Sequence, residues 1–146
     1  IVRVASRTIT KLVIDGNNMC YEDRSFIGLD ALLALTYALV VKYEILVVFD
    51  AAIRQMTRMS DREIANDFPR EVRVHVVATK QTADETILES ASGVDAYIVS
   101  NDRFRDFTDK SVVKGQRLIR HEIVDGRVLV HDLNVRLLYK QRHVAD

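Results

Sequence analysis

Two apolar segments of the chain each run into a carboxylate. Residues 11–15 read KLVID, and residues 96–102 read AYIVSND. Such runs are typical of buried parallel strands, and in open α/β sheets ligands bind just beyond the carboxyl ends of the strands. Together with Asp84, the carboxylates Asp15 and Asp102 therefore predict one negative pocket. Such pockets bind hard divalent cations, which promote the cleavage of phosphodiesters.

The first carboxylate, Asp15, is followed by Gly16, Asn17 and Asn18. Glycine permits a sharp turn or a close approach of the backbone to a ligand. The two asparagine side chains could orient a water molecule or a phosphate. The same residue types are common in any turn that follows a strand. The segment alone therefore leaves a functional loop and a simple turn equally open.

The second carboxylate lies in a charged segment. Asp106 follows Asp102 by four residues, which places both on one face if the segment is helical. Several carboxylates at one point repel one another by roughly several kcal/mol at a low effective dielectric, so a cluster of them requires cations. Arg103 and Arg105 offer an alternative, because they could neutralise the same charges without a metal. Ser100, Asn101 and Asp102 also suit an ordinary helix N-cap.

Three other acidic residues have simple structural explanations. Asp84 lies in the first turn of a helix that Thr82 would cap, where the helix dipole favours carboxylates. Glu85 points roughly 100° away around that helix, as a solvated neighbour or a secondary ligand. Asp50 ends an apolar run and either lines the same cleft or caps the loop that follows it.

The elements expected around these residues alternate between strand and helix. Such alternation predicts an α/β fold, a three-layer α/β/α sandwich with a mostly parallel central sheet. A capping box at Ser60 and Glu63 and a C-cap at Gly93 mark helix ends. Asp125-Gly126 between two alternating runs predicts a C-terminal β-hairpin. The expected strands are 11–15, 44–50, 72–78 and 96–100. The expected helices are 29–43, 82–92, a last one over 133–141, and one within the charged segment 51–68 that Ser60 caps and Pro69 stops. One or two helical turns are expected over 103–110 and a polar loop over 16–26.

Length and composition place the chain among ordinary globular proteins. Its 146 residues are 48% hydrophobic and 29% charged, which predicts one domain over 1–146 with an N-terminal extension over 1–10 and a hairpin and tail over 117–146. Basic and acidic residues number 21 each, so only local charge bears on partners. One cysteine, Cys20, fits a reducing compartment, and we expect a cytoplasmic protein. We expect no membrane span and no signal peptide.

Other kinds of site find little support in the sequence. The four histidines lack zinc-ligand spacing, and a single cysteine excludes a cysteine-rich zinc site. No GxGxxG follows the first strand, and neither GxxxxGK[ST] nor GxSxG occurs. Cys20 lies near the expected pocket without an obvious base, which indicates an inert thiol.

Basic residues gather at two places. Arg54, Arg58 and Arg62 recur every four residues, which places them on one face if the segment is helical. Lys80 and the arginines after Asp102 are expected on the cleft side of the sheet. Both groups could hold a phosphate backbone. With 21 basic residues in the chain, a spacing of four also arises by chance.

Three segments together resemble a known family. VIDGNN over 13–18, an aspartate that opens a helix at Asp84, and IVSNDRFRDF over 98–107 are similar to the NYN domain of the PIN-like ribonuclease superfamily, and most similar to its regnase-type, zinc-finger-associated branch. The resemblance spans about residues 11–110, in matching order and spacing. It implies a PIN-like fold and an Mg²⁺- or Mn²⁺-dependent endoribonuclease that cleaves single-stranded RNA.

The resemblance also assigns roles to individual residues. It implies that Asp15, Asp84, Asp102 and Asp106 hold one or two metal ions, and that Asn18 joins them in catalysis. We expect direct metal contact from Asp15 and Asp102. The other two would act on a second ion or through water. The basic residues expected to contact RNA are Arg54, Arg58, Lys80, Arg103 and Arg105.

The chain departs from the regnase-type pattern in three places. Two adjacent aspartates open the third helix in that branch, but the first of the two positions is Ala83 here. One supporting carboxylate is therefore missing, and whether Glu85 compensates stays open. Lys80 and Gln81 stand where an arginine-rich loop is expected, and the zinc finger is absent from this sequence.

The sequence leaves one main alternative function and two weaker ones. The main alternative is a nuclease-fold RNA-binding or scaffold module with weak or no turnover, which Ala83 keeps open. A receiver-type signalling domain with Asp50 as phosphate acceptor lacks the acidic pair after the first strand. A phosphatase of the haloacid-dehalogenase type needs an aspartate where Asn17 stands. A homodimer is compatible with the sequence but nothing in it demonstrates one.

Overall fold

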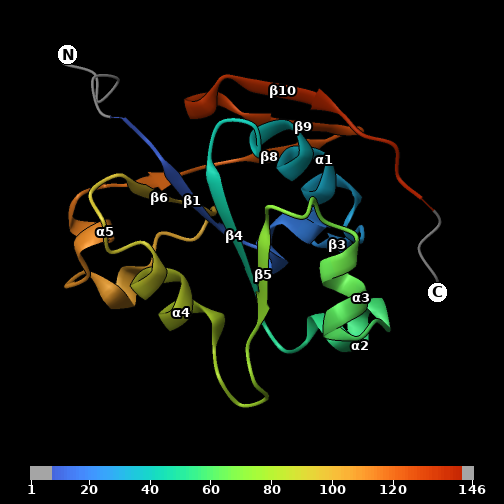
Figure 1. Cartoon of the computed structure of the whole chain (residues 1–146), viewed down its shortest axis with the longest axis horizontal. Coiled ribbons are helices and arrows are strands. Elements are labelled where there is room, and N and C mark those ends of the chain that lie inside the picture. Colours follow the sequence, from blue (N-terminus) through green and yellow to red (C-terminus); the bar gives the residue numbers. More distant parts are fainter. Residues whose placement is uncertain (1–7, 143–146) are drawn as a thin grey trace.

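A five-stranded parallel sheet forms the centre of the computed structural model, which describes residues 8–142 (Figure 1). Its strands lie in the order β5 (Arg73–Val76), β4 (Glu44–Phe49), β1 (Lys11–Asp15), β6 (Ala96–Val99) and β7 (Leu118–Ile119). Every neighbouring pair is parallel. The four predicted strands are therefore confirmed. Because β1 lies between β4 and β6, Asp15 ends beside the carboxyl ends of both.

The sheet is covered on both faces, as a three-layer fold requires. Leu12 and Ile14 of β1 pack in one hydrophobic core, whereas Val13 between them packs in the other. Successive side chains of a strand point to opposite faces, which explains this division. The first core contains α1 (Asp30–Leu39), and the second contains α4 (Ala83–Ser90) and α5 (Ser111–Lys114) on the other side of the sheet (Figure 1). The predicted α/β architecture is confirmed.

The helices are shorter than the sequence predicted. The charged segment 51–68 forms two helices, α2 (Ile53–Thr57) and α3 (Asp61–Asn66), of which only the second, capped by Ser60, was predicted. They separate at Arg58, whose left-handed backbone (φ 57°) ends α2. The predicted capping box at the start of α3 is present, with both hydrogen bonds between Ser60 and Glu63. The predicted C-cap at Gly93 is wrong, because α4 ends at Ser90 and Ala91 caps it.

Short elements fill the loops between these helices and strands. The expected polar loop over 16–26 contains a 3-10 helix, η2 (Asn17–Cys20), and a small antiparallel hairpin. Residues 103–110 contain a single 3-10 turn, η3 (Arg105–Phe107). The hairpin consists of β2 (Tyr21–Glu22) and β3 (Ser25–Phe26), and a further 3-10 turn is η4 (His131–Leu133).

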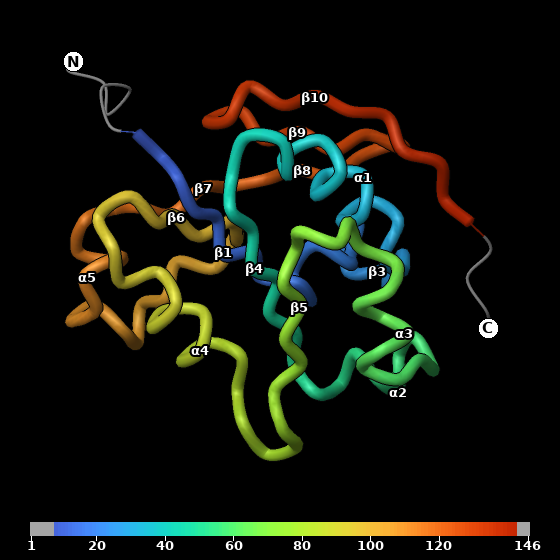
Figure 2. The backbone as a smooth tube through the Cα atoms, viewed as in Figure 1, coloured from blue at the N-terminus to red at the C-terminus, as the bar shows by residue number. Residues whose placement is uncertain are grey.

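The C-terminal part forms a second, antiparallel sheet. Its order is β10 (Val135–Leu138), β9 (Arg127–Val130), β8 (Glu122–Val124). The hairpin around Asp125-Gly126 is confirmed. The predicted helix over 133–141 is wrong: Val135 and Leu137 pack inward while Arg136 and Leu138 are exposed, which is the period of a strand. β9 and β10 contact α1 and run along one side of the molecule (Figure 2).

Two expectations concern the ends of the chain and the membrane. The expected N-terminal extension over 1–10 lies mostly outside the described residues. Between residues 8 and 142, no helix has both the length and the apolar character needed to cross a membrane.

Candidate active site

Two of the predicted aspartates are linked through one serine hydroxyl. Asp15 ends β1 with only 9% of its surface exposed. Ser100 Oγ donates to Asp15 Oδ2 at 2.8 Å and accepts a hydrogen bond from the Asp102 N–H at 3.0 Å. Asp102 Oδ1 in turn accepts from the Phe104 N–H at 2.7 Å. The hydroxyl thus fixes the loop after β6 against the end of β1.

A second set of hydrogen bonds, from amide side chains, holds the same loop. Asn18 Oδ1 accepts from the Asn101 N–H at 2.9 Å. The Asn101 side chain forms two 2.9 Å hydrogen bonds with the backbone of His121, donating to its carbonyl and accepting from its N–H. The Asn18 side chain therefore positions the 100–102 segment, and its backbone N–H donates to the Asp15 carboxylate.

On the other side of β1, the neighbouring asparagine contacts β4. Asn17 Oδ1 accepts from the Asp50 N–H at 2.8 Å, and Asp50 Oδ1 accepts from the Ala83 N–H at 2.9 Å. Asp50 therefore caps the first turn of α4, which carries Asp84. The hydroxyl of Thr82, the residue predicted to cap this helix, makes no capping hydrogen bond. The sequence left open whether Asp50 lines the cleft or caps the loop that follows it; the observed contact is instead with the head of α4, 33 residues away.

The aspartates lie close enough to perturb one another. Burial raises the pKa of Asp15 to about 6, and the charges of Asp84 and Asp50 add to the rise, against the lowering effect of the hydrogen bonds from Ser100 and Asn18. The pKa of Asp84 is also raised, first by burial and then by the charges of Asp102, Asp50 and Asp106. All four predicted metal-binding aspartates therefore belong to one electrostatic cluster, and Asp50 belongs to it as well.

The donor chemistry of this cluster suits a hard cation. Its side chains offer carboxylate oxygens, which Mg²⁺ and Mn²⁺ prefer, and Mg²⁺ commonly uses one or two carboxylates and takes its other ligands from water and substrate phosphates. Across residues 8–142, no group of three or more His, Cys, Asp or Glu side chains is already arranged as a metal site. The cluster fits an open site completed by water and substrate.

A comparison with models of known protein families matches residues 8–136 to the Zc3h12a-like Ribonuclease NYN domain. The chain belongs to this family. The match spans most of the chain and confirms the resemblance seen in the sequence. Membership of a ribonuclease family indicates a nuclease whose substrate is RNA. A search among curated proteins found no match.

Within this NYN domain, the backbone that carries Asp106 differs from the helix expected from the sequence. The helix that would place Asp102 and Asp106 on one face does not form, because Phe104 between them has a left-handed backbone (φ 51°) and is buried. The chain turns at this residue and enters η3, which contains Asp106. The charge of Asp106 still acts on Asp84.

The predicted arginine face of the NYN domain does not exist. Arg54 lies on α2, Arg62 lies on α3, and Arg58 occupies the left-handed residue between them. Arg54 is engaged in an ion pair, with its Nε 2.7 Å and one terminal nitrogen 3.1 Å from the two carboxylate oxygens of Asp61. This prediction failed because helical spacing was applied across a break between two helices.

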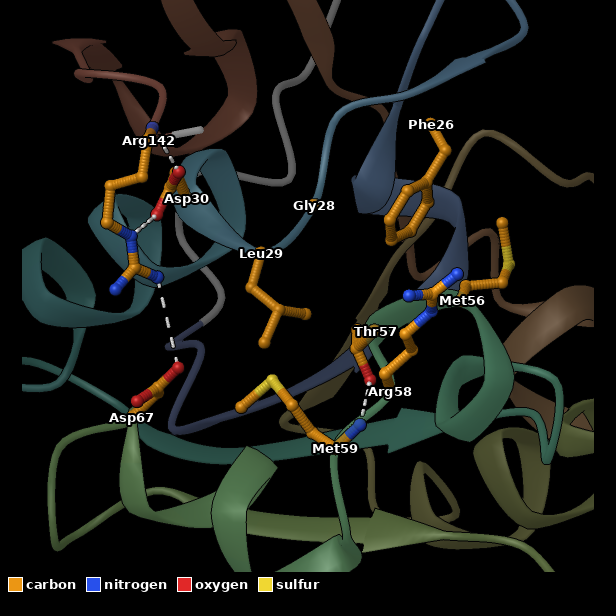
Figure 3. Close-up of a pocket in the computed structure, with 10 residues that line it drawn as sticks. All are labelled: Phe26, Gly28, Leu29, Asp30, Met56, Thr57, Arg58, Met59, Asp67 and Arg142. Carbon is orange, nitrogen blue, oxygen red and sulfur yellow. Dashed lines mark hydrogen bonds and ion pairs between the residues drawn. The ribbon is translucent and has the colours of Figure 1, made fainter. Parts of the chain in front are cut away.

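Arg58 lines a groove of about 390 Å³ that none of the predicted metal-binding aspartates lines. Figure 3 shows this arginine beside Phe26 and Met56, while the Met59 side chain extends toward Leu29. The opposite wall carries an ion pair of 2.6 Å between Arg142 Nε and Asp30 Oδ1 (Figure 3). The residues that line the groove are Phe26, Gly28, Leu29, Asp30, Met56, Thr57, Arg58, Met59, Asp67 and Arg142.

Three other predicted RNA contacts follow the carboxyl ends of strands. Lys80 lies in the loop between β5 and α4, while Arg103 and Arg105 follow β6, and all three are exposed. In the part of the chain that the structure describes, none of them forms an ion pair with a carboxylate. The two arginines therefore do not neutralise the aspartates by direct pairing.

The residues that position the aspartates could not be identified from the sequence. Ser100, Asn101 and Asn17 act through partners far away in the chain; Ser100 and Asp15, for example, are 85 residues apart. Their only signal was a run of small polar residues after each strand. Cys20 is buried, and burial raises its thiol pKa to about 12, in agreement with an inert thiol.

Proposed function

We propose that this NYN domain is a metal-dependent endoribonuclease that cleaves single-stranded RNA. The observation that carries the proposal is the hydrogen-bonded link Asp15–Ser100–Asp102 at the carboxyl edge of the sheet, together with the charge coupling that joins Asp84 and Asp106 to it. A protein has little structural reason to gather like charges in this way, since their repulsion is costly without a cation.

The four aspartates would hold Mg²⁺ or Mn²⁺. A bound divalent ion would supply an activated water and would stabilise negative charge on the scissile phosphate. Asp15, with its pKa near 6, is mostly ionised at neutral pH and largely protonated below pH 5. Ser100 would keep the Asp15 carboxylate in one orientation, and Asn18 would hold the 100–102 loop beside it.

The exposed cations around this edge would bind the substrate backbone. Lys80, Arg103 and Arg105 follow strand ends on the same edge of the sheet as Asp15 and carry no carboxylate partner among the described residues. Phosphate contacts of this kind position a nucleic acid without reading its sequence. Arg54 and Arg58 are weaker candidates, since one is paired with Asp61 and the other lines a different groove.

A second candidate function is RNA binding with weak or no turnover. The observations that favour it are the buried Ala83 at the head of α4 and the lack, among residues 8–142, of an already assembled group of metal ligands. The two functions differ in one measurable property, since only a nuclease consumes its RNA in a metal-dependent reaction.

Cleavage of an end-labelled single-stranded RNA, with Mn²⁺ or Mg²⁺, tests the proposal. Wild type should produce internal cuts that EDTA stops, and Asp102→Asn should reduce the rate by about a thousandfold or more, as for loss of a central charged group in catalysis. Asp109→Asn is the matched control, because this exposed aspartate is not among the charges that perturb Asp15 or Asp84. Bound but uncut RNA in every case would favour the binding module, and equal cutting by Asp102→Asn would contradict the proposed site.

A further inference from the structure

A polar pocket lies beside the 100–102 loop, where the chain passes from β7 to β8 (Figure 2). Its volume is about 540 Å³. The residues that line it are Asn101, Arg120, His121, Glu122, His131 and Asp132. None of them belongs to the proposed metal-binding aspartates, and the family resemblance assigned none of them a role. The pocket therefore offers a site of its own next to the candidate active site.

Asn101 and His121 join this pocket to the active site. The Asn101 side chain makes two hydrogen bonds of 2.9 Å to the backbone of His121, and the residue after Asn101 is Asp102. The His121 ring donates a hydrogen bond to the backbone of Asn18, whose side chain accepts from the Asn101 N–H at 2.9 Å. A group held in the pocket would therefore lie next to the loop that carries Asp102.

One nitrogen of the His121 ring is buried without a partner. His121 is only 6% exposed, and its Nδ1 is the one buried side-chain nitrogen or oxygen between residues 8 and 142 that makes no hydrogen bond. The other ring nitrogen donates to Asn18, and burial lowers the pKa of the ring to about 4, so Nδ1 is an acceptor at neutral pH. Because buried polar atoms are nearly always paired, Nδ1 marks a place for a hydrogen-bond donor.

The two acids of the pocket are acceptors as well. Glu122 Oε1 lies 3.2 Å from His131 Nε2, while Glu122 Oε2 and the Asp132 carboxylate have no hydrogen bond or ion pair with any residue in the described range. Two carboxylates repel a phosphate, and no three acidic or histidine side chains among residues 8–142 are arranged to hold a metal. The lining therefore favours a neutral ligand with several N–H donors, with one exposed cation, Arg120, beside it.

Among the RNA bases, guanine matches this set of groups. Its Watson–Crick edge carries an N1–H and an N2 amine side by side, which a carboxylate can accept together, and O6 beside them accepts from a cation. Uracil has one N–H between two carbonyls, and adenine and cytosine each have one amine beside a ring nitrogen that accepts. Proteins commonly read such edges on the unstacked bases of single-stranded RNA.

We propose that this pocket binds an unstacked guanine of the single-stranded RNA substrate, close to the phosphate at the aspartate cluster, with Glu122 and Asp132 as the residues that select the base. This inference rests on the proposed nuclease function and deepens it, because it gives the enzyme a base preference near the cut. The two carboxylates accept from N1–H and the N2 amine, and Arg120 donates to O6. His121 Nδ1 accepts the remaining amine hydrogen, directly or through a water.

RNA binding in EDTA, measured by fluorescence anisotropy on the full chain, tests the base preference without cleavage. A labelled oligouridine with one central guanosine should bind about fivefold or more tightly than the same RNA with adenosine, cytidine or uridine at that position, as expected for one bidentate base contact. Inosine, which lacks the N2 amine, should lose most of this gain.

A double variant with a matched control assigns the preference to the pocket. Glu122→Gln with Asp132→Asn should bind all four RNAs alike. Glu71→Gln with Asp109→Asn removes the same charge from two exposed acids outside the pocket and should keep the wild-type ratio of affinities. The ratio between RNAs is the readout, because the loss of two negative charges strengthens binding to every RNA. A wild-type ratio in the pocket variant would overturn the inference.

Mapping of the cuts made with Mn²⁺ separates this inference from the proposed function. The wild type should cut at a fixed position relative to the guanosine, and the pocket variant should cut without that preference. Cleavage by a wild type that binds all the RNAs equally would overturn the guanine pocket and leave the proposed nuclease intact. Guanine-selective binding without any cleavage would support the pocket and contradict the nuclease.

Discussion

The two asparagines after β1 hold opposite sides of the same site, and the two sides are built differently. On the β6 side, Asn18 fixes the 100–102 loop, where the Ser100 hydroxyl joins one carboxylate to the backbone of the next. On the β4 side, Asn17 fixes Asp50, whose carboxylate is joined to the N-terminus of a helix. The β6 side thus controls the orientation of the acids, and the β4 side controls the placement of α4.

This difference has a functional consequence. A change on the β6 side should act mainly on catalysis, because it disturbs the contact between Asp15 and the loop that carries Asp102. A neutral, cap-preserving change on the β4 side should leave the helix in place and act through charge.

After the loss of Asp102 itself, the largest effect is expected from Ser100→Ala. It removes a hydrogen bond to a buried carboxylate, worth roughly 1.5–3 kcal/mol, which corresponds to a loss in cleavage rate of about 10- to 100-fold. The Ser100 hydroxyl also lowers the pKa of Asp15, so the acidic limb of the pH–rate profile should move to higher pH. Ser60→Ala is the matched control: it removes a helix cap at a cost of about 1 kcal/mol in stability, and its cleavage profile should be that of the wild type.

The next effect concerns stability as a function of pH. The pKa of Asp15 is raised to about 6, so between about pH 4 and 6 the folded protein holds a proton that the unfolded chain has lost. Ionisation of Asp15 therefore lowers the free energy of unfolding as the pH rises through this window. Asp15→Asn should be more stable than the wild type by roughly 3 kcal/mol at pH 7 and close to it near pH 4, as measured by urea unfolding without metal.

His121, on the β6 side, should change the free energy of unfolding with pH in the direction opposite to Asp15. Burial lowers its pKa to about 4, so from pH 6.5 down to 4 the unfolded chain binds a proton that the folded protein does not. Stability from this residue is lost as the pH falls. The pH profile of Asp15→Asn should therefore rise more steeply between pH 4 and 6 than that of the wild type. Parallel profiles for the two proteins would contradict the raised pKa of Asp15.

A smaller difference in kcat is expected between the alanine variants of Asn18 and Asn17. Asn18→Ala removes the side-chain contact to the Asn101 N–H but keeps the backbone donor to Asp15. Loss of one such hydrogen bond, worth about 1 kcal/mol, should lower kcat by about fivefold to tenfold with little change in KM. Asn17→Ala, the matched change on the β4 side, should lower kcat less. The reverse order would contradict the assignment of acid orientation to the β6 side.

The smallest effects are expected at the exposed cations. Lys80→Ala and Arg103→Ala should each weaken RNA binding by about two- to fivefold and reduce the slope of log K against log salt by about one. Arg54→Ala should leave RNA binding unchanged, because this arginine is paired with Asp61. Filter binding at several salt concentrations measures all three. A larger loss in Arg54→Ala than in Lys80→Ala would place the RNA across α2 instead.

The parts of the fold that the sequence predicted are those set by local pattern. The apolar run over 11–15 gave β1 with its correct bounds, and Asp125-Gly126 gave the β8–β9 hairpin. The final helix was wrong because pairing with β9 and packing on α1 decide the conformation of residues 135–138. Helix α2 and its end at Arg58 were missed because a left-handed arginine leaves no clear signal in the sequence.

The same distinction holds for the site. The aspartates could be chosen from strand ends and from a family resemblance, since both are visible in the order of residues. The contacts that position them could not, because Asn17 meets Asp50 33 residues away and Asn18 meets Asn101 83 residues away. Such contacts depend on the strand order β4-β1-β6, which places three distant loops at one edge.

The most direct test of the central claim, that these aspartates form a cation site, is Mn²⁺ calorimetry on wild type and Asp15→Asn at pH 7.5. The wild type should bind Mn²⁺, and Asp15→Asn should lose at least about tenfold in affinity although its metal-free fold is the more stable of the two. A variant that is more stable but binds less cannot owe its defect to unfolding. Equal Mn²⁺ affinity in the two proteins would contradict the claim.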